Sequence, residues 1–127
     1  MKTAEDVESY LIQMEANYEA VQDRLWVIKD MGADVVVSMS DPLLVFRAKV
    51  LDVDQVPEGK RGELFEKLLA LNVTDMLHGA YGLEEGAVVI TATLPLENLD
   101  YNEFQSTVDD VGLALTNHYQ TLSALAA

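Results

Sequence analysis

A strand–turn–strand pattern in residues 79–95 constrains the fold of this chain more than any other feature. Two sets of side chains alternate after the turn: Val88, Ile90, Ala92 and Leu94, and between them Val89, Thr91 and Thr93. The turn itself is Glu84-Glu85-Gly86, where Gly86 can take a positive φ, and Pro95 ends the second strand. The pattern therefore predicts an antiparallel β-hairpin.

The residues before the hairpin predict one helix followed by three strands. Apolar side chains at spacings of three and four indicate one face of a first helix: Val7, Leu11, Met14, Tyr18 and Val21. Strand-like segments follow at Leu25–Lys29, Val35–Met39 and Leu43–Asp52. Turn residues at 31–34 and 40–42 separate these segments, so we expect an antiparallel meander.

Two further helices complete the predicted order. One runs from about Glu63 to Asn72 and is apolar around much of its circumference. The other begins after Asp100, a predicted cap with Glu103 three residues on, and has one apolar stripe: Phe104, Val108, Val111, Leu115, Tyr119 and Leu122. The order α-β-β-β-α-β-β-α predicts a single α+β domain over residues 1–127. We expect its antiparallel sheet to pack on the first and last helices, with the other face partly open.

Charge and composition exclude several classes of function. The net charge is −14, and no lysine or arginine follows Lys67, so binding to nucleic acid phosphates is not expected. The chain has no cysteine, which excludes disulfides and thiol nucleophiles. The sequence also predicts no secretory signal, no membrane segment, and a cytoplasmic location.

No constellation of residues indicates catalysis, a cofactor or a metal. Residues 52–63 place acids as a calcium loop would, but Pro57 stands where that loop requires glycine, so no metal site is predicted. His78 and His118 are the only histidines, and we expect packing or surface roles for both. The neighbours Asp109 and Asp110 point apart on a helix and are interpreted as a solvated acidic face.

A partner-binding surface is predicted on the open face of the sheet. Alternation in the third strand separates a uniform apolar face from a mixed one, and the mixed face is Leu43, Val45, Arg47, Lys49 and Leu51. The predicted partner-binding residues are Trp26, Leu43, Val45, Arg47, Lys49 and Val89. For Trp26 two interpretations stay open, a core position and an anchor for the partner.

The second helix predicts a homodimer. It offers more apolar surface than one contact with a sheet should bury, and the predicted interface residues are Leu64, Phe65, Leu68, Leu69 and Leu71. A surplus apolar patch of this kind usually marks an interface between chains.

The chain resembles the type III secretion chaperone-like fold, and within it the YbjN-domain and Tir-chaperone-like group. The resemblance is carried by Leu68-Leu-Ala-Leu-Asn72, the hairpin after it, and Leu94-Pro-Leu96 before an acidic helix. It implies a small acidic cytoplasmic protein that binds another protein as a homodimer and does no chemistry. Secretion chaperone and YbjN-like regulator both stay open. The alternative class is a small ligand-binding or enzymatic domain, which a closed pocket at His78 or His118 would favour.

Overall fold

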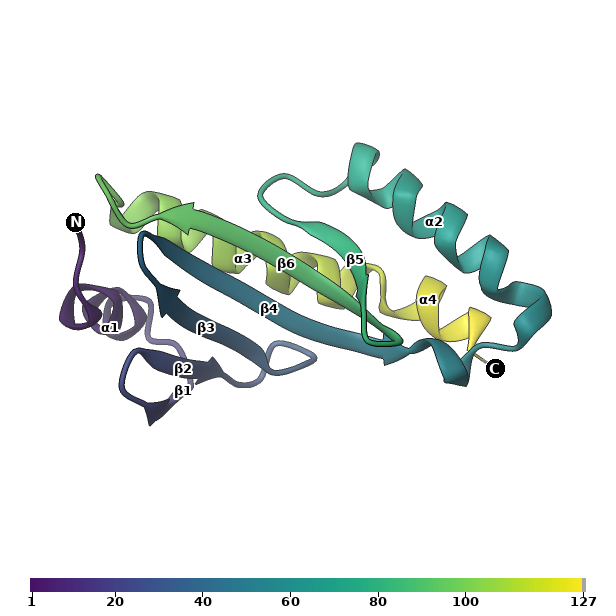
Figure 1. The fold of residues 1–127 in the computed structure, drawn as a ribbon, viewed down its shortest axis with the longest axis horizontal. Helices are drawn as coiled ribbons and strands as arrows, with labels where there is room; N and C mark the ends of the chain where they lie inside the picture. Colours follow the sequence, from purple (N-terminus) through teal and green to yellow (C-terminus); the bar gives the residue numbers. More distant parts are fainter. Residues whose placement is uncertain (127) are drawn as a thin grey trace.

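The structure, a computed structural model, describes residues 1–126 (Figure 1). Its elements in chain order are α1 (Ala4–Gln13), β1 (Tyr18–Gln22), β2 (Leu25–Ile28), β3 (Val35–Ser40), β4 (Leu43–Asp52), the 3₁₀ turns η1 (Val53–Gln55) and η2 (Glu58–Lys60), α2 (Arg61–Thr74), β5 (Ala80–Glu84), β6 (Ala87–Pro95), α3 (Tyr101–Asn117) and α4 (Tyr119–Leu125).

The strands form one antiparallel sheet in the order β1-β2-β3-β4-β6-β5. The long strands β4 and β6 lie at its centre, and α3 crosses behind them in Figure 1. The turn between β5 and β6 has φ of 49° at Glu85 and 80° at Gly86, which confirms the predicted hairpin. The predicted α+β class, with an antiparallel sheet packed on helices, is confirmed.

The first predicted helix is too long, and the sheet has a sixth strand. The helix ends at Gln13, and Glu15 adopts a φ of 58°, which a continuing α-helix does not allow. Tyr18 and Val21 therefore lie in β1, the strand at one edge of the sheet. The last predicted helix is divided at His118 into α3 and α4.

The core lies between the sheet and helices α1 and α3. Leu44, Phe46 and Ala48 of β4 point into it and are almost fully buried. The ring of Phe104 on α3 packs 5.6 Å from the ring of Phe46, and 5.5 Å from the ring of Tyr10 on α1 (centroid distances). These contacts fix α1 and α3 over one face of the sheet, and the other face carries exposed charged side chains of β4.

Helix α2 packs beside the opposite edge of the sheet, next to β5. The Asn72 side chain accepts a hydrogen bond from the Tyr81 backbone N–H (2.6 Å) and donates one to the Tyr81 carbonyl (3.1 Å). An amide side chain thus takes the place of a neighbouring strand at this position. No helix within residues 1–126 is both long enough and apolar enough to span a membrane.

Candidate functional site

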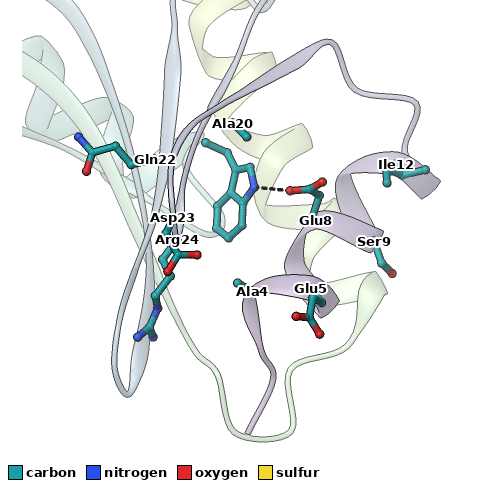
Figure 2. A pocket seen from close by; sticks show the side chains of 10 residues that line it. Ala4, Glu5, Glu8, Ser9, Ile12, Ala20, Gln22, Asp23 and Arg24 are labelled. Carbon is teal, nitrogen blue, oxygen red and sulfur yellow. Dashed lines mark hydrogen bonds between the residues drawn. The ribbon is translucent and has the colours of Figure 1, made fainter.

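A groove of about 510 Å³ lies between α1 and the edge strand β1 (Figure 2). Its walls come from α1, from β1 and from the turn after β1. Trp26 of β2 forms its floor and is only 2% exposed. The indole Nε1–H of Trp26 donates a hydrogen bond of 3.0 Å to Glu8 Oε1 on α1, as Figure 2 shows. This bond joins the helix wall to the floor.

The local sequence sets the position of the helix wall. Thr3 caps α1, since its hydroxyl accepts a hydrogen bond from the Asp6 N–H and the Asp6 carboxylate accepts one from the Thr3 N–H. The Asp6 carboxylate accepts hydrogen bonds from the Thr3 N–H and from the Thr3 hydroxyl, and these two bonds lower the pKa of Asp6 below its usual value. The chain then reverses at Glu15 and returns as β1, so the helix and the edge strand must lie beside each other.

The backbone of β1 has an open hydrogen-bonding edge along this groove. Lys29 N–H donates to the Asn17 carbonyl (2.6 Å), and the register then places Glu19 opposite Val27 and Ala20 opposite Trp26. Hydrogen-bonded pairs alternate in an antiparallel ladder, so the backbone N–H and carbonyl of Ala20 point away from β2. Strand β1 is the terminal strand of the sheet, so these groups can pair with an added strand.

The charge of the groove is mainly negative. Glu5 and Glu8 lie on its helix wall, and Asp23 lies in the turn that closes one end. The single basic residue that lines it, Arg24, is paired with Asp41. A basic segment would therefore be attracted to this groove, and an acidic one repelled.

Five of the predicted partner-binding residues lie together on the sheet face opposite α1 and α3: Leu43, Val45, Arg47, Lys49 and Val89. Arg47 forms an ion pair with Glu84 (3.3 Å) and Lys49 with Asp52 (2.8 Å). Val89 is only 6% exposed. This face is therefore open but partly covered by its own side chains.

Trp26 does not belong to that face. It pairs with Val37, which in turn pairs with Phe46, so all three point toward the helices. Trp26 and Ile28 lie on the same face of β2 and are buried, and α1 covers that face at Trp26. The structure therefore places Trp26 in the core, and its only exposed part lies at the floor of the groove.

The residues predicted for a dimer interface also divide in two. Leu64, Leu68 and Leu71 are buried in the core of the chain and offer no surface to a second copy, which corrects that part of the prediction. Phe65 is half-buried and Leu69 is 68% exposed. The exposed apolar stripe of α2 continues with Val73 and is followed by Leu77. These two residues were missed because the helix was predicted to end at Asn72.

Asp110 has a structural role that the sequence analysis missed. It is buried, whereas its neighbour Asp109 is exposed as predicted. Its carboxylate accepts hydrogen bonds from the backbone N–H groups of His78 (2.8 Å) and Leu77 (3.2 Å). The loop between α2 and β5 is therefore tied to α3 by charge-assisted bonds.

Replacing Asp110 by alanine is expected to lower the free energy of unfolding by about 2 kcal/mol, because two backbone donors lose a charged acceptor. Urea unfolding measures the change. The matched control is Asp109→Ala, which should stay within about 0.5 kcal/mol of the parent because Asp109 is exposed. Equal losses from the two substitutions would contradict the assigned role of Asp110.

A second hydrogen-bonded cluster joins three elements around His118. The Tyr81 hydroxyl lies 2.6 Å from His118 Nδ1, and His118 Nε2 lies 3.0 Å from Asp75 Oδ2. Hydrogen bonds from the Thr74 hydroxyl and from His118 lower the pKa of Asp75. Burial, and next the charge of Asp75, raise the pKa of Tyr81 to about 12. His78, for which a packing role or a surface role was expected, lies on the surface.

The shifted pKa of Tyr81 predicts a loss of stability at high pH. Its folded pKa of about 12 lies above the ordinary value of 10.0, so the unfolded chain releases this proton first. The contribution of neutral Tyr81 to the free energy of unfolding is therefore fully present below pH 10, and it decreases as the pH rises from there toward 12. Urea unfolding at pH 9 and 11.5 should show a smaller decrease in Tyr81→Phe than in the parent, whereas exposed Tyr119→Phe should match the parent.

Comparison with known proteins identifies the class defined by this fold. The fold is similar to that of YbjN from E. coli, with a TM-score of 0.69 and 14% identity over 94% of this chain and 93% of that chain. A chain of the ExoU–SpcU complex from Pseudomonas aeruginosa gives 0.69 and 15% identity over 94% and 96%. The complex of the Yersinia pestis chaperone SycH with a fragment of YscM2 gives 0.61 and 14% over 94% and 98%.

The family follows from the sequence profile. The CesT_Tir_1 profile matches residues 1–127, so the chain belongs to this family of type III chaperones. The family resemblance that the hairpin and the Leu-Pro-Leu pattern indicate is thereby confirmed. No curated protein matches the chain.

Proposed function

We propose that the chain is a non-catalytic, chaperone-like protein of the cytoplasm that holds an extended segment of another protein. The observation that carries this proposal is the open edge of β1 beside a groove with an aromatic floor. An extended peptide can join such an edge as an additional strand, with backbone hydrogen bonds for affinity and side-chain pockets for specificity. The family supports a partner-binding role, as do ExoU–SpcU and SycH–YscM2, which are complexes of two proteins.

The chemistry of the groove favours a segment with basic and apolar side chains. Acidic groups of α1 would attract the basic side chains, and Ile12, which is exposed on the same wall, offers apolar contact. A peptide of alternating lysine and valine is a suitable probe. It should bind with an affinity that falls as salt is added, and a glutamate–valine peptide of equal length should not bind.

The open sheet face remains a second proposed surface for the partner. Leu43 and Val45 would supply apolar contact there, and Arg47 and Lys49 would act mainly on the rate of association. Val89 lies on the same face but is only 6% exposed, so it would add little contact area. Substitution of Val45 distinguishes this surface from the groove.

We also propose that two copies associate through the exposed stripe of α2. Phe65, Leu69 and Val73 follow one another at a spacing of four, so they lie on one side of the helix. Leu77 after the helix and Leu83 on the edge strand β5 are exposed as well. Because Asn72 already occupies hydrogen-bonding groups of β5, a second copy would pack against side chains here.

A regulatory role is the alternative within the same architecture, since YbjN is described as a candidate transcription regulator. Partner capture from a cell extract, followed by mass spectrometry, distinguishes the two. A secreted effector as the captured protein would support a secretion chaperone, and a component of a regulatory complex would support the alternative. A captured protein that joins the sheet as an added strand should be lost in a variant of the β1 edge.

A further inference from the structure

A second hollow, of about 240 Å³, lies where α3 and α4 meet the end of β4. Its apolar lining includes Val50 and Leu51 of β4, Leu115 of α3 and Leu122 of α4. Two irregularities surround it: β4 has a bulge between Lys49 and Leu51, and the C-terminal helix is divided at His118. The hollow is partly open to solvent, since Tyr119 in its lining is 67% exposed, and a depression of this size between ordered elements can hold a small molecule.

One wall of the hollow is polar. Tyr81 and His118 both line it and are 6% and 7% exposed. Asp75 is ionised at neutral pH and can only accept, so the proton of His118 lies on Nε2. In the neutral imidazole, Nδ1 carries no proton and accepts from the Tyr81 hydroxyl. The Tyr81 oxygen has used its proton but keeps lone pairs, and these can accept a hydrogen bond from a ligand.

We propose that this hollow binds a neutral, mostly apolar molecule of one or two fused rings that donates a hydrogen bond to the Tyr81 oxygen. The size follows from the volume, which lies between the roughly 150 Å³ that holds benzene and the roughly 300 Å³ or more of a drug-sized pocket. The neutral charge follows from the lining, because no Asp, Glu, Lys or Arg of residues 1–126 lines the hollow. The net charge of −14 further disfavours an anion. This inference does not depend on the proposed binding of a partner segment.

Indole and indene test the proposal, because they share shape and size and differ in the N–H donor. Titration of the ¹⁵N-labelled protein with indole should shift amide signals around Leu115, His118 and Leu122, with a dissociation constant below about 1 mM. Indene should bind about five- to tenfold more weakly, since it cannot donate a hydrogen bond. Equal affinities would overturn the assigned role of Tyr81.

Filling the hollow provides the matched variants. Ala114→Met adds bulk at the wall formed by α3 and should abolish the indole-dependent shifts, whereas Leu113→Met, on the exposed side of the same helix, should leave them unchanged. Ser123→Leu fills the hollow from α4 and replaces Ala114→Met if that variant does not fold. Absence of saturable binding by the parent, or binding that survives in both filled variants, overturns the proposal.

Discussion

Ala20→Pro is expected to reduce binding of the lysine–valine peptide at least about tenfold while the domain remains folded. Proline removes the backbone N–H of Ala20, which points to the open side of β1, and leaves the bonds between β1 and β2 in place. Edge strands tolerate proline where the lost donor faces solvent. The variant therefore removes the ability to pair with an added strand and keeps every charge of the groove.

Trp26 provides the measurement, because it is the single tryptophan of the chain and lies on the floor of the groove. Its fluorescence should change on peptide binding in the parent and in Ala20→Val, which keeps the N–H. Far-UV circular dichroism verifies the fold of each variant. If Ala20→Pro binds as well as the parent, addition of a strand at β1 is wrong.

Val45→Asp tests the other proposed surface with the same peptide. Val45 is half-buried on the face opposite the helices, so the variant should fold. A loss of binding in Val45→Asp with full binding in Ala20→Pro would place the partner on the open sheet face. The reverse result supports the groove. Unfolding of Val45→Asp would show that this side chain belongs to the core.

The elements predicted correctly are those whose local signals agree with their tertiary environment. The hairpin combines a two-residue turn at Glu85 and Gly86 with strict alternation in β6, and each signal alone favours the same structure. Asp100 caps α3 through its bond with the Glu103 N–H, as its sequence pattern predicts. The two faces of β4 were also assigned correctly up to Lys49, after which the bulge turns Leu51 toward the core side.

The errors arise where tertiary contacts override a periodic pattern. Tyr18 and Val21 continue the helical spacing of α1, yet the reversal at Glu15 makes them part of a strand. The groove depends on that strand, so it could not be predicted from the sequence. The sequence also does not show which leucines of α2 are buried. Leu64, Leu68 and Leu69 are the same residue type, and only the packing of the helix makes the first two buried and the third exposed.

Leu69→Asp is expected to convert the proposed homodimer into a monomer. Leu69 lies at the centre of the exposed stripe, so in a dimer its side chain would be removed from water, and an aspartate there would be buried without a cation. Burying a leucine contributes roughly 1.5–3 kcal/mol in each copy, and the carboxylate adds a desolvation cost to that loss. The combined effect should exceed a hundredfold in the dimer dissociation constant.

Light scattering at high micromolar concentration measures the outcome, with twice the chain mass of 14.0 kDa expected for the parent and 14.0 kDa for the variant. The matched control is Leu113→Asp, which places the same charge at an exposed leucine on α3 and should leave the dimer intact. Because each chain already carries a net charge of −14, added salt should strengthen the parent dimer by screening repulsion between the copies. A parent protein that scatters as a monomer at every salt concentration would refute the proposed homodimer.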